Sequence, residues 1–208
     1  MKNLLFLGDS ITDCSHYFDP ENLGRGYVRM ISEKINTPDK NNQVLNKGND
    51  GFTVPAVRRL WKRSCLNLQP DYITILIGIN DLSVIKNTEI TPSVGLCDFR
   101  DQYQALIDDI RVLADCPILL MEPFIFPYPA EYAGWESELH QMTALIQELA
   151  ASNRLAFLPL WEKLSSVAKE EGYPAITTDG IHLTDKGHQI LATAWIDFMN
   201  SRKLSNIF

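Results

Sequence analysis

The chain has 208 residues, of which 45% are hydrophobic and 22% are charged, and we expect a single compact domain with a substantial core over residues 1–208. Its net charge of −7 argues against nucleic acid or an anionic membrane as partner, because both require clustered lysines and arginines. No stretch approaches the ~20 apolar residues of a membrane span, and the apolar run after Lys2 is too short for a signal peptide, so we expect a cytoplasmic protein.

Short, continuous apolar runs bounded by turn residues recur along the chain and predict strands that are buried on both faces. These runs lie at residues 3–7, 43–46, 72–77, 117–121 and 155–158. Between them, apolar residues recur at helical spacing, most clearly at residues 99–113 and 135–149. This alternation predicts an α/β fold in which a five-stranded parallel sheet has helices on both faces.

The last helix has a clear start. Thr184 is of a residue type preferred at the N-cap, and apolar residues then continue along one helix face as far as Phe198. His182 is therefore placed on the loop directly before this helix. The proline-rich stretch at residues 122–129 cannot form a regular helix, so we expect a loop that leaves the fourth strand.

In open α/β sheets, ligands bind outside the carboxyl ends of the strands. Ser10 follows the first predicted strand, residues 48–51 follow the second, Asn80 follows the third and residues 122–129 follow the fourth. The sequence therefore predicts that these groups gather at one edge of the sheet.

Ser10, His182 and Asp179 have the chemistry of a nucleophile, its base and an orienting carboxylate. A serine hydroxyl is a poor nucleophile unless an imidazole takes its proton, and the imidazole needs a carboxylate that fixes its tautomer. Asp185 is a competing carboxylate, but its place in the first turn of the last helix suits an interaction with the helix dipole, so we favour Asp179. The alternative for Ser10 is that it only caps the helix that follows it.

Attack on an ester builds negative charge on the carbonyl oxygen, and hydrogen-bond donors must be in place to receive that charge. The sequence offers the backbone N–H of Ser10, a glycine N–H within residues 46–51, and the side-chain amide of Asn80. The competing interpretations are that Asn80 only holds the turn after the third strand and that the glycine only supplies a positive φ.

The motifs occur in a fixed order: GDS at residues 8–10, a glycine-containing turn at 46–51, GIND at 78–81 and DGIH at 179–182. This set resembles the SGNH hydrolases, also called the GDSL family, over essentially the whole chain. The resemblance maps the marker residues onto Ser10, Gly51, Asn80 and His182, with Asp179 completing a triad. It implies a three-layer α/β/α, flavodoxin-like sandwich without metal or organic cofactor. It also implies that the N–H groups of Ser10 and Gly51 and the side chain of Asn80 form the oxyanion hole.

A narrower resemblance is carried by residues 8–14, 23–28, 46–48 and 77–81. These segments are similar to the intracellular acetyl-xylan esterases of the family, which remove acetyl groups from xylo-oligosaccharides. The chain departs from that subgroup at Phe52 and Pro55, where more polar residues are expected, and at Thr178, where a bulky aromatic residue is typical. The acyl pocket and the sugar preference therefore follow from the sequence less directly than the chemistry does.

Five residues near the predicted site are candidates for contact with substrate: Asp9, Phe52, Phe124, Thr178 and Ile181. The aromatic residues from Phe124 to Trp135 could form a wall of an acyl or sugar pocket, or could belong to the core, as aromatic side chains usually do. Asp9 and Asp81 could instead accept hydrogen bonds from the backbone rather than take part in chemistry.

The remaining histidines and the cysteines carry no metal-binding pattern. We interpret His16, His140 and His188 as structural because none has a partner at a recognisable spacing. The cysteines are far apart, without a CxxC pair or a histidine at ligand spacing, and we expect reduced thiols and no metal site. The cysteines are Cys14, Cys65, Cys97 and Cys116.

The sequence thus predicts a serine esterase that hydrolyses short-chain acyl esters through an acyl-enzyme on Ser10, with an acetylated xylo- or other oligosaccharide as the expected substrate. The alternative within enzymes is a broad-specificity lysophospholipase or thioesterase. A different class is a non-catalytic module that binds a small ligand, such as phosphate, at the helix beginning near Ser10, but the chain lacks a glycine-rich phosphate loop. Whether the chain forms a homo-oligomer is not decided by the sequence.

Overall fold

The computed structural model describes residues 1–38 and 41–202. Its strands form a five-stranded sheet in the order β2-β1-β3-β4-β5, and each neighbouring pair is parallel. The strands are β1 (Asn3–Gly8), β2 (Gln43–Gly48), β3 (Tyr72–Leu76), β4 (Ile118–Met121) and β5 (Ala156–Leu158). All five coincide with the predicted apolar runs, and their order is that of flavodoxin-like sheets.

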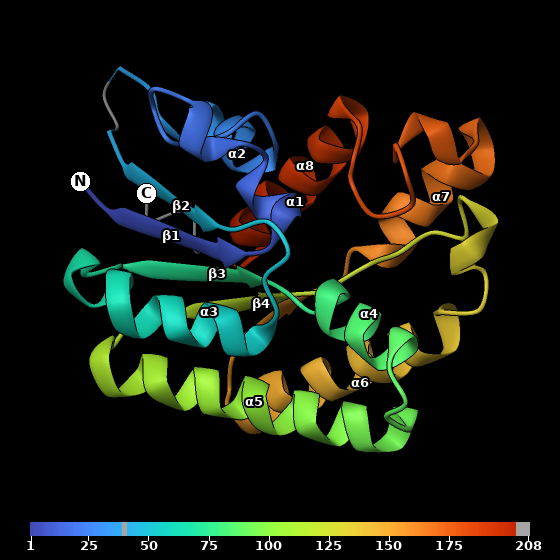
Figure 1. The fold of residues 1–208 in the computed structure, drawn as a ribbon. Helices are drawn as coiled ribbons and strands as arrows, with labels where there is room; N and C mark the ends of the chain where they lie inside the picture. The colour runs from blue at the N-terminus through green and yellow to red at the C-terminus, as the bar shows by residue number, and fades with distance from the viewer. Residues whose placement is uncertain (39–40, 203–208) are drawn as a thin grey trace.

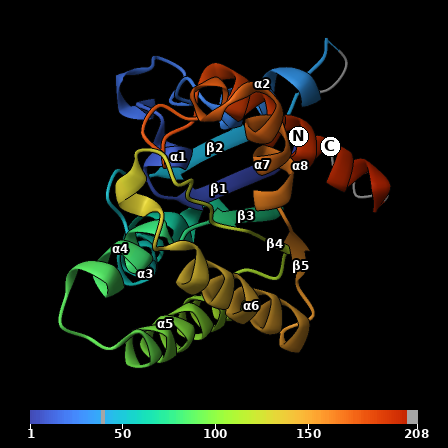
Figure 2. The same ribbon diagram turned by 90° about the vertical axis from the view of Figure 1, so that its right-hand side faces the viewer.

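Helices cover both faces of the sheet (Figures 1 and 2), so the predicted three-layer α/β/α sandwich is confirmed. One face is covered by α2 (Tyr27–Ile35) and α8 (Asp185–Ser201), and the other by α3 (Val54–Leu60), α5 (Pro92–Leu113) and α6 (Glu136–Ser152). The remaining α-helices are α1 (Ser10–Asp13), α4 (Ile79–Asn87) and α7 (Trp161–Glu171). No helix in the described part of the chain combines the length and apolar character of a membrane span.

Short segments of other helix types complete the described structure. They are η1 (His16–Phe18), the π-helical η2 (Trp61–Cys65), η3 (Leu66–Leu68), η4 (Ala130–Tyr132) and η5 (Tyr173–Ala175). Of these, η1 follows directly after α1 and thus lies next to the carboxyl end of β1.

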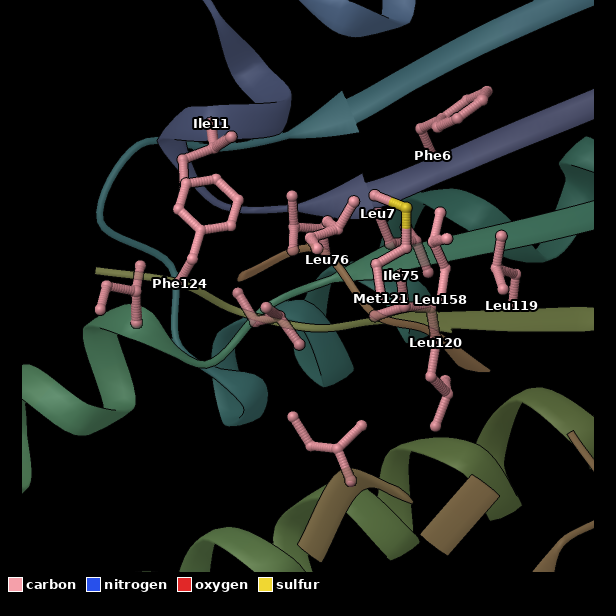
Figure 3. Close-up of a cluster of buried hydrophobic side chains, with 14 of the residues drawn as sticks. Phe6, Leu7, Ile11, Ile75, Leu76, Leu119, Leu120, Met121, Phe124 and Leu158 are labelled. Atoms are coloured by element: carbon pink, nitrogen blue, oxygen red, sulfur yellow. The ribbon is translucent and has the colours of Figure 1, made fainter. Parts of the chain in front are cut away.

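The core lies between the sheet and the two helical layers. The inner strands are buried along their whole apolar length because helices cover both faces, and this explains why they are continuous apolar runs rather than alternating ones. Figure 3 shows side chains of β1, β3 and β4, among them Leu7, Ile75 and Leu120, in one cluster. On the other face, Trp195 of α8 packs against Phe6, with ring centroids 5.7 Å apart.

The start of the last helix agrees with its prediction. The side chain of Thr184 is the N-cap of α8, and its hydroxyl oxygen accepts a hydrogen bond from the backbone N–H of Gly187 at 3.2 Å. The same hydroxyl donates to the carbonyl oxygen of Ala175 at 2.7 Å. The loop that carries His182 is thereby fixed at the point where it enters the helix.

The strand register brings three loop-bearing strand ends level with one another. Gly8 pairs with Gly48 on one side and with Leu76 on the other. The three strands therefore end together at the edge that faces α1 and α4, away from the labelled N-terminus (Figure 1). Chain order reverses between β1 and β3, and such a switch point opens the crevice in which α/β proteins bind ligands.

Candidate active site

Ser10, His182 and Asp179 form a continuous chain of hydrogen bonds at this edge. The Oγ atom of Ser10 is 2.9 Å from Nε2 of His182, and Nδ1 of the same imidazole is 2.6 Å from Oδ2 of Asp179. The serine comes from the start of α1, and the other two residues come from the loop before α8, where His182 lies 172 positions along the chain from the serine. The structure thus brings together the three residues that the sequence suggested as a triad.

The Asp179 carboxylate is held in its ionised form by the loop around it. Burial raises its pKa, but the hydrogen bond from the His182 side chain and those from the backbone N–H groups of His182 and Ile181 outweigh burial and leave the pKa below its usual range. The two backbone donors lie 2.8 and 3.0 Å from Oδ1. An ionised carboxylate at Nδ1 favours the tautomer that carries its proton there, so Nε2 is left to accept a proton from Ser10.

Gly180 allows this loop to lie close to the proline-rich loop. Its φ is +93°, and a Cβ atom at this position would be 2.2 Å from the backbone oxygen of Tyr128. The Gly180 carbonyl oxygen accepts a hydrogen bond from the N–H of Phe126 at 2.9 Å. The loop between Asp179 and His182 therefore rests on the segment after β4, and a larger residue would push it away.

Asp9, and not Ser10, caps the helix that follows β1. Its Oδ1 atom accepts a hydrogen bond from the N–H of Ile11 at 3.0 Å. The Asp9 side chain is 1% exposed, and burial raises its pKa to about 7. The hydroxyl of Ser10 is therefore free to face His182, and its backbone N–H, at the first position of α1, has no acceptor within the helix.

Gly51 lies in a tight turn after β2. The N–H of Phe52 donates to the carbonyl oxygen of Asn49 at 3.2 Å, and Gly51 has a φ of +71° at the third position of this turn. A Cβ atom on Gly51 would meet nothing within 4 Å, so the backbone conformation, rather than space, favours glycine. Within the described residues, the N–H of Gly51 makes no hydrogen bond.

Asn80 lies in the first turn of α4 and is tied to the same turn. Its Nδ2 atom donates to the carbonyl oxygen of Phe52 at 2.9 Å, which accounts for one of its two amide protons. The neighbouring Asp81 accepts a hydrogen bond from the N–H of Val54 at 3.1 Å to each oxygen, and burial raises its pKa to about 7. Asp81 thus bonds to the backbone, as does Asp9, in agreement with the interpretation from sequence.

The candidates for substrate contact divide into exposed and buried residues. Phe52 and Ile181 are partly exposed and Thr178 is exposed at the sheet edge. Phe124 has 0% exposure and points toward Ile11 within the core (Figure 3). The structure thus gives Phe124 a packing role and no open surface for substrate, and it places Asp9 beneath the helix start rather than in contact with solvent.

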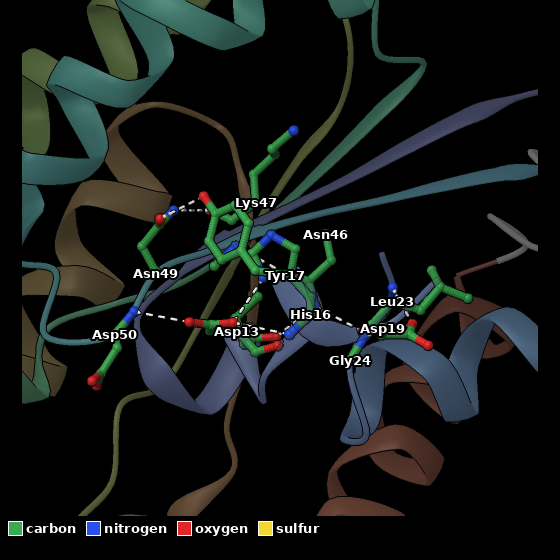
Figure 4. Close-up of polar contacts among 12 residues, drawn as sticks. Asp13, His16, Tyr17, Asp19, Leu23, Gly24, Asn46, Lys47, Asn49 and Asp50 are labelled. Carbon is green, nitrogen blue, oxygen red and sulfur yellow. Dashed lines mark hydrogen bonds and ion pairs between the residues drawn. The ribbon is translucent and has the colours of Figure 1, made fainter. Parts of the chain in front are cut away.

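A second Asp–His pair lies beside the triad, and our interpretation of the histidine missed it. Oδ1 of Asp13 is 2.8 Å from Nδ1 of His16 and accepts a hydrogen bond from its backbone N–H at 3.1 Å. Oδ2 of Asp13 accepts a hydrogen bond from the N–H of Asp50, also at 3.1 Å (Figure 4). The signal was available in the sequence, because residues 13–16 repeat the Asp-x-x-His spacing of residues 179–182.

His188 also has partners that its sequence context did not reveal. Its Nδ1 atom accepts a hydrogen bond from the N–H of Tyr27 at 3.3 Å, so the ring proton lies on Nε2, which is 3.6 Å from the Cys14 sulfur. Burial lowers the pKa of His188 to about 4. Across residues 1–38 and 41–202, no group of three or more His, Cys, Asp or Glu side chains could hold a metal ion.

Comparison with known proteins identifies the class to which this fold and site belong. The sequence model of the GDSL-like lipase/acylhydrolase family matches residues 6–190. The chain therefore belongs to this family and is, as the sequence predicts, an ester hydrolase.

Individual relatives agree with that assignment. The chain is 30% identical to an acetylxylan esterase of Geobacillus stearothermophilus over 94% of its own length and 92% of that esterase. It is 26% identical to an isoamyl acetate-hydrolysing esterase of Saccharomyces cerevisiae, over 91% of this chain and 82% of the yeast protein. The crystal structure of Axe2, an acetylxylan esterase from Geobacillus stearothermophilus, matches 94% of this chain and 93% of its own with a TM-score of 0.80 at 27% identity.

Proposed function

We propose that this protein is a serine esterase that removes acetyl groups from small carbohydrates, with Ser10 as nucleophile, His182 as general base and acid, and Asp179 as the group that orients the imidazole. The observation that carries the proposal is the unbroken hydrogen-bond chain from Ser10 Oγ through His182 to Asp179 Oδ2, at 2.9 and 2.6 Å.

The reaction proceeds in two halves. Ser10 Oγ attacks the acyl carbon while its proton passes to His182 Nε2, and the charged imidazolium is stabilised by the Asp179 carboxylate. The bond to the alcohol oxygen then breaks, and His182 gives its proton to that oxygen. In the second half, water attacks the acyl group on Ser10 and loses a proton to His182, and the acid departs as the serine regains its hydrogen.

Negative charge on the carbonyl oxygen is received by three donors: the N–H of Ser10, the N–H of Gly51 and the free side-chain proton of Asn80. Both backbone donors are free to serve this role: the N–H of Ser10 has no acceptor within its helix, and the N–H of Gly51 makes no hydrogen bond within the described residues. The hydrogen bond from Asn80 to the carbonyl oxygen of Phe52 at 2.9 Å couples the side-chain donor to the turn that carries Gly51. Donors fixed in advance stabilise charge that develops only in the transition state.

The relatives support both the residues and the acyl group. Structures of Axe2 described as catalytic mutants replace a serine, an aspartate or a histidine by alanine, and the replaced aspartate and histidine are three positions apart, as are Asp179 and His182. One relative is an acetylxylan esterase and the other hydrolyses isoamyl acetate. Acetyl is therefore the acyl group we assign, and an oligosaccharide taken up by the cell is the alcohol we assign.

Hydrolysis of nitrophenyl esters of increasing acyl length tests the assignment of the acyl group. Turnover should be greatest for acetate and should fall for longer acyl chains. A preference for acyl chains of about eight carbons would show that the protein is a lysophospholipase or thioesterase and not an acetyl esterase, since such chains need a long apolar acyl site. A panel of acetylated xylo-oligosaccharides, assayed by acetate release, then tests the alcohol.

A further inference from the structure

A cavity of about 400 Å³ borders one side of the proposed triad. Ser10 and His182 line it, together with four residues of the segment that contains η1: Cys14, Ser15, Tyr17 and Phe18. Asp50 also lines the cavity, whereas Gly51 and Asn80 do not. The space therefore lies on the histidine side of Ser10 rather than on the side of Gly51 and Asn80.

This position matches the place of the alcohol in an ester bound for hydrolysis. The carbonyl oxygen must point to the Gly51 and Asn80 donors, whereas the alcohol oxygen must lie within hydrogen-bond reach of His182 Nε2, which gives it a proton as it leaves. A cavity that touches Ser10 and His182 but neither Gly51 nor Asn80 is thus suited to the alcohol half of the substrate.

Two exposed aromatic side chains border this cavity. Tyr17 is 62% exposed and Phe18 is 88% exposed, although large apolar side chains are usually covered in a folded protein. Tyr17 is nevertheless held in place: its hydroxyl donates to Oδ1 of Asn49 at 2.8 Å, and its ring lies against that of His16, with centroids 4.0 Å apart (Figure 4). His16 is itself paired with Asp13. A ring held in this way loses little conformational freedom when a ligand packs on it.

The cavity is lined by two carboxylates together with hydroxyl and imidazole groups. Asp13 and Asp50 contribute the carboxylates and Ser15 a hydroxyl, and within residues 1–38 and 41–202 no lysine or arginine lines the space. Carboxylates form strong hydrogen bonds with hydroxyl donors, and they disfavour an anionic ligand through like-charge repulsion. An uncharged sugar ring satisfies both demands, because it offers hydroxyl donors at its rim and an apolar C–H face that an aromatic ring can cover.

We propose that the cavity beside His182 is the alcohol subsite of the esterase, in which Tyr17 and Phe18 form a platform for an uncharged pyranose ring and Asp50 accepts hydrogen bonds from its hydroxyls. The proposal rests on the function proposed above and adds the residues that select the alcohol. It adds the segment after α1 to the aromatic residues predicted near the site, of which Phe124 and Phe126 are buried and Tyr128 is 39% exposed.

Two acetate esters that differ only in the alcohol test the subsite: an acetylated methyl xyloside and ethyl acetate. Phe18→Ala should raise KM for the xyloside about tenfold while kcat/KM for ethyl acetate stays within about twofold, since only the xyloside covers the ring. Tyr17→Ala should raise KM for the xyloside about tenfold relative to Tyr17→Phe, because both variants lose the bond to Asn49 and only the alanine variant loses the ring. Tyr17→Phe keeps the ring but loses the bond to Asn49, and it should retain most of the xyloside affinity. Val112→Ala removes an apolar side chain that is 80% exposed on α5 and serves as the matched control.

The charge of the cavity gives an independent readout. The wild-type enzyme should favour the neutral xyloside over an acetylated methyl glucuronoside, which adds a carboxylate to the ring, and Asp50→Asn should reduce this preference several-fold. A preference that is unchanged in Asp50→Asn would overturn the role of Asp50.

Equal losses of kcat/KM on both acetate esters, or an unchanged KM for the xyloside in both aromatic variants, would overturn the role of Tyr17 and Phe18 as a platform. A dimer that dissociates in Phe18→Ala without a change in KM for the xyloside would assign the rings to contact between two copies of the chain instead. Ethyl acetate turnover distinguishes failure of the subsite from failure of the esterase function, because a wild-type protein unable to cleave ethyl acetate would refute the esterase itself.

Discussion

The Asp13 carboxylate is joined to the backbone of Asp50, whose N–H donates to Oδ2 at 3.1 Å. The next residue in the chain is Gly51, one of the proposed oxyanion donors. The other carboxylate oxygen is engaged by the side chain and the backbone of His16, so Asp13 cannot turn away from the loop without breaking these bonds. Asp13 therefore fixes the position of the turn after β2 relative to α1, which carries Ser10.

Replacing Asp13 by alanine should lower kcat with little change in KM for ethyl acetate. The Gly51 N–H would lose its exact placement, and because complete loss of one oxyanion donor costs about a hundred- to a thousandfold, we expect a loss of at least about tenfold. Steady-state kinetics, corrected for the folded fraction from thermal unfolding, measure it. An unchanged kcat together with a lower Tm would show that Asp13 contributes to stability and does not position the Gly51 donor.

Asn80→Ala should lower kcat by about a hundred- to a thousandfold while KM changes little, since the side-chain donor acts on charge that develops only in the transition state. Asn87→Ala is the matched control, because Asn87 lies on the same helix but is exposed, and among the described residues its side chain bonds only to Ser83. Near-normal kcat together with a lowered Tm in Asn80→Ala would show that Asn80 only stabilises the turn.

Asp179→Asn should lower kcat/KM severely, whereas Asp185→Asn should lower it only mildly. The Asp179 carboxylate contacts Nδ1 of His182 at 2.6 Å, and in serine proteases the equivalent change to asparagine lowers kcat about ten-thousandfold. Asp185 is an exposed residue in the first turn of α8. Comparison of kcat/KM for the two variants on one nitrophenyl acetate decides between them, and the reverse ranking would assign the orienting role to Asp185.

His188 should make stability depend on pH. Burial lowers its pKa to about 4 in the folded state, whereas an imidazole in the unfolded chain has a pKa of ~6.5. Its stabilising contribution is therefore fully present above about pH 6.5 and is lost as the pH falls toward 4, because only the unfolded chain takes up the proton in that interval. The slope for this one group is at most about 1.4 kcal/mol per pH unit.

Urea unfolding of wild type and His188→Gln at pH 7.5, 6.0 and 5.0 measures this contribution. The free energy of unfolding of wild type should fall more steeply toward pH 5 than that of His188→Gln. The exposed His140 provides a control, and His140→Gln should keep the wild-type slope. Parallel pH profiles for wild type and His188→Gln would contradict the buried, neutral imidazole.

The sheet and the motif positions could be predicted because their signals are local. Strands covered on both faces must be apolar at every position, so the buried run of β3 is visible in the sequence itself. Thr184 marks the start of α8 through its own side-chain chemistry. Ser10 and Asn80 each follow such a strand directly, and parallel strands necessarily deliver the residues after them to one edge.

The remaining features depend on contacts between distant segments. The bond between Asp13 and Asp50 spans 37 positions and the bond between Tyr17 and Asn49 spans 32, and no periodic pattern encodes such pairs. The burial of Phe124 likewise depends on core residues that come from other segments of the chain. The sequence could therefore suggest which residues carry the chemistry, but not how the loop that bears Gly51 is held, nor which aromatic side chains remain exposed.

Covalent labelling of Ser10 tests the central claim most directly. Folded wild-type protein treated with a fluorophosphonate probe should gain a single adduct in its intact mass, and peptide mapping should place the adduct on Ser10, because the probe reports a serine activated by its histidine. The adduct should be absent in Ser10→Ala and should form far more slowly in His182→Ala. Folded wild-type protein that hydrolyses acetate esters but gains no adduct, or Ser10→Ala that retains more than about a tenth of kcat, would contradict the acyl-enzyme mechanism.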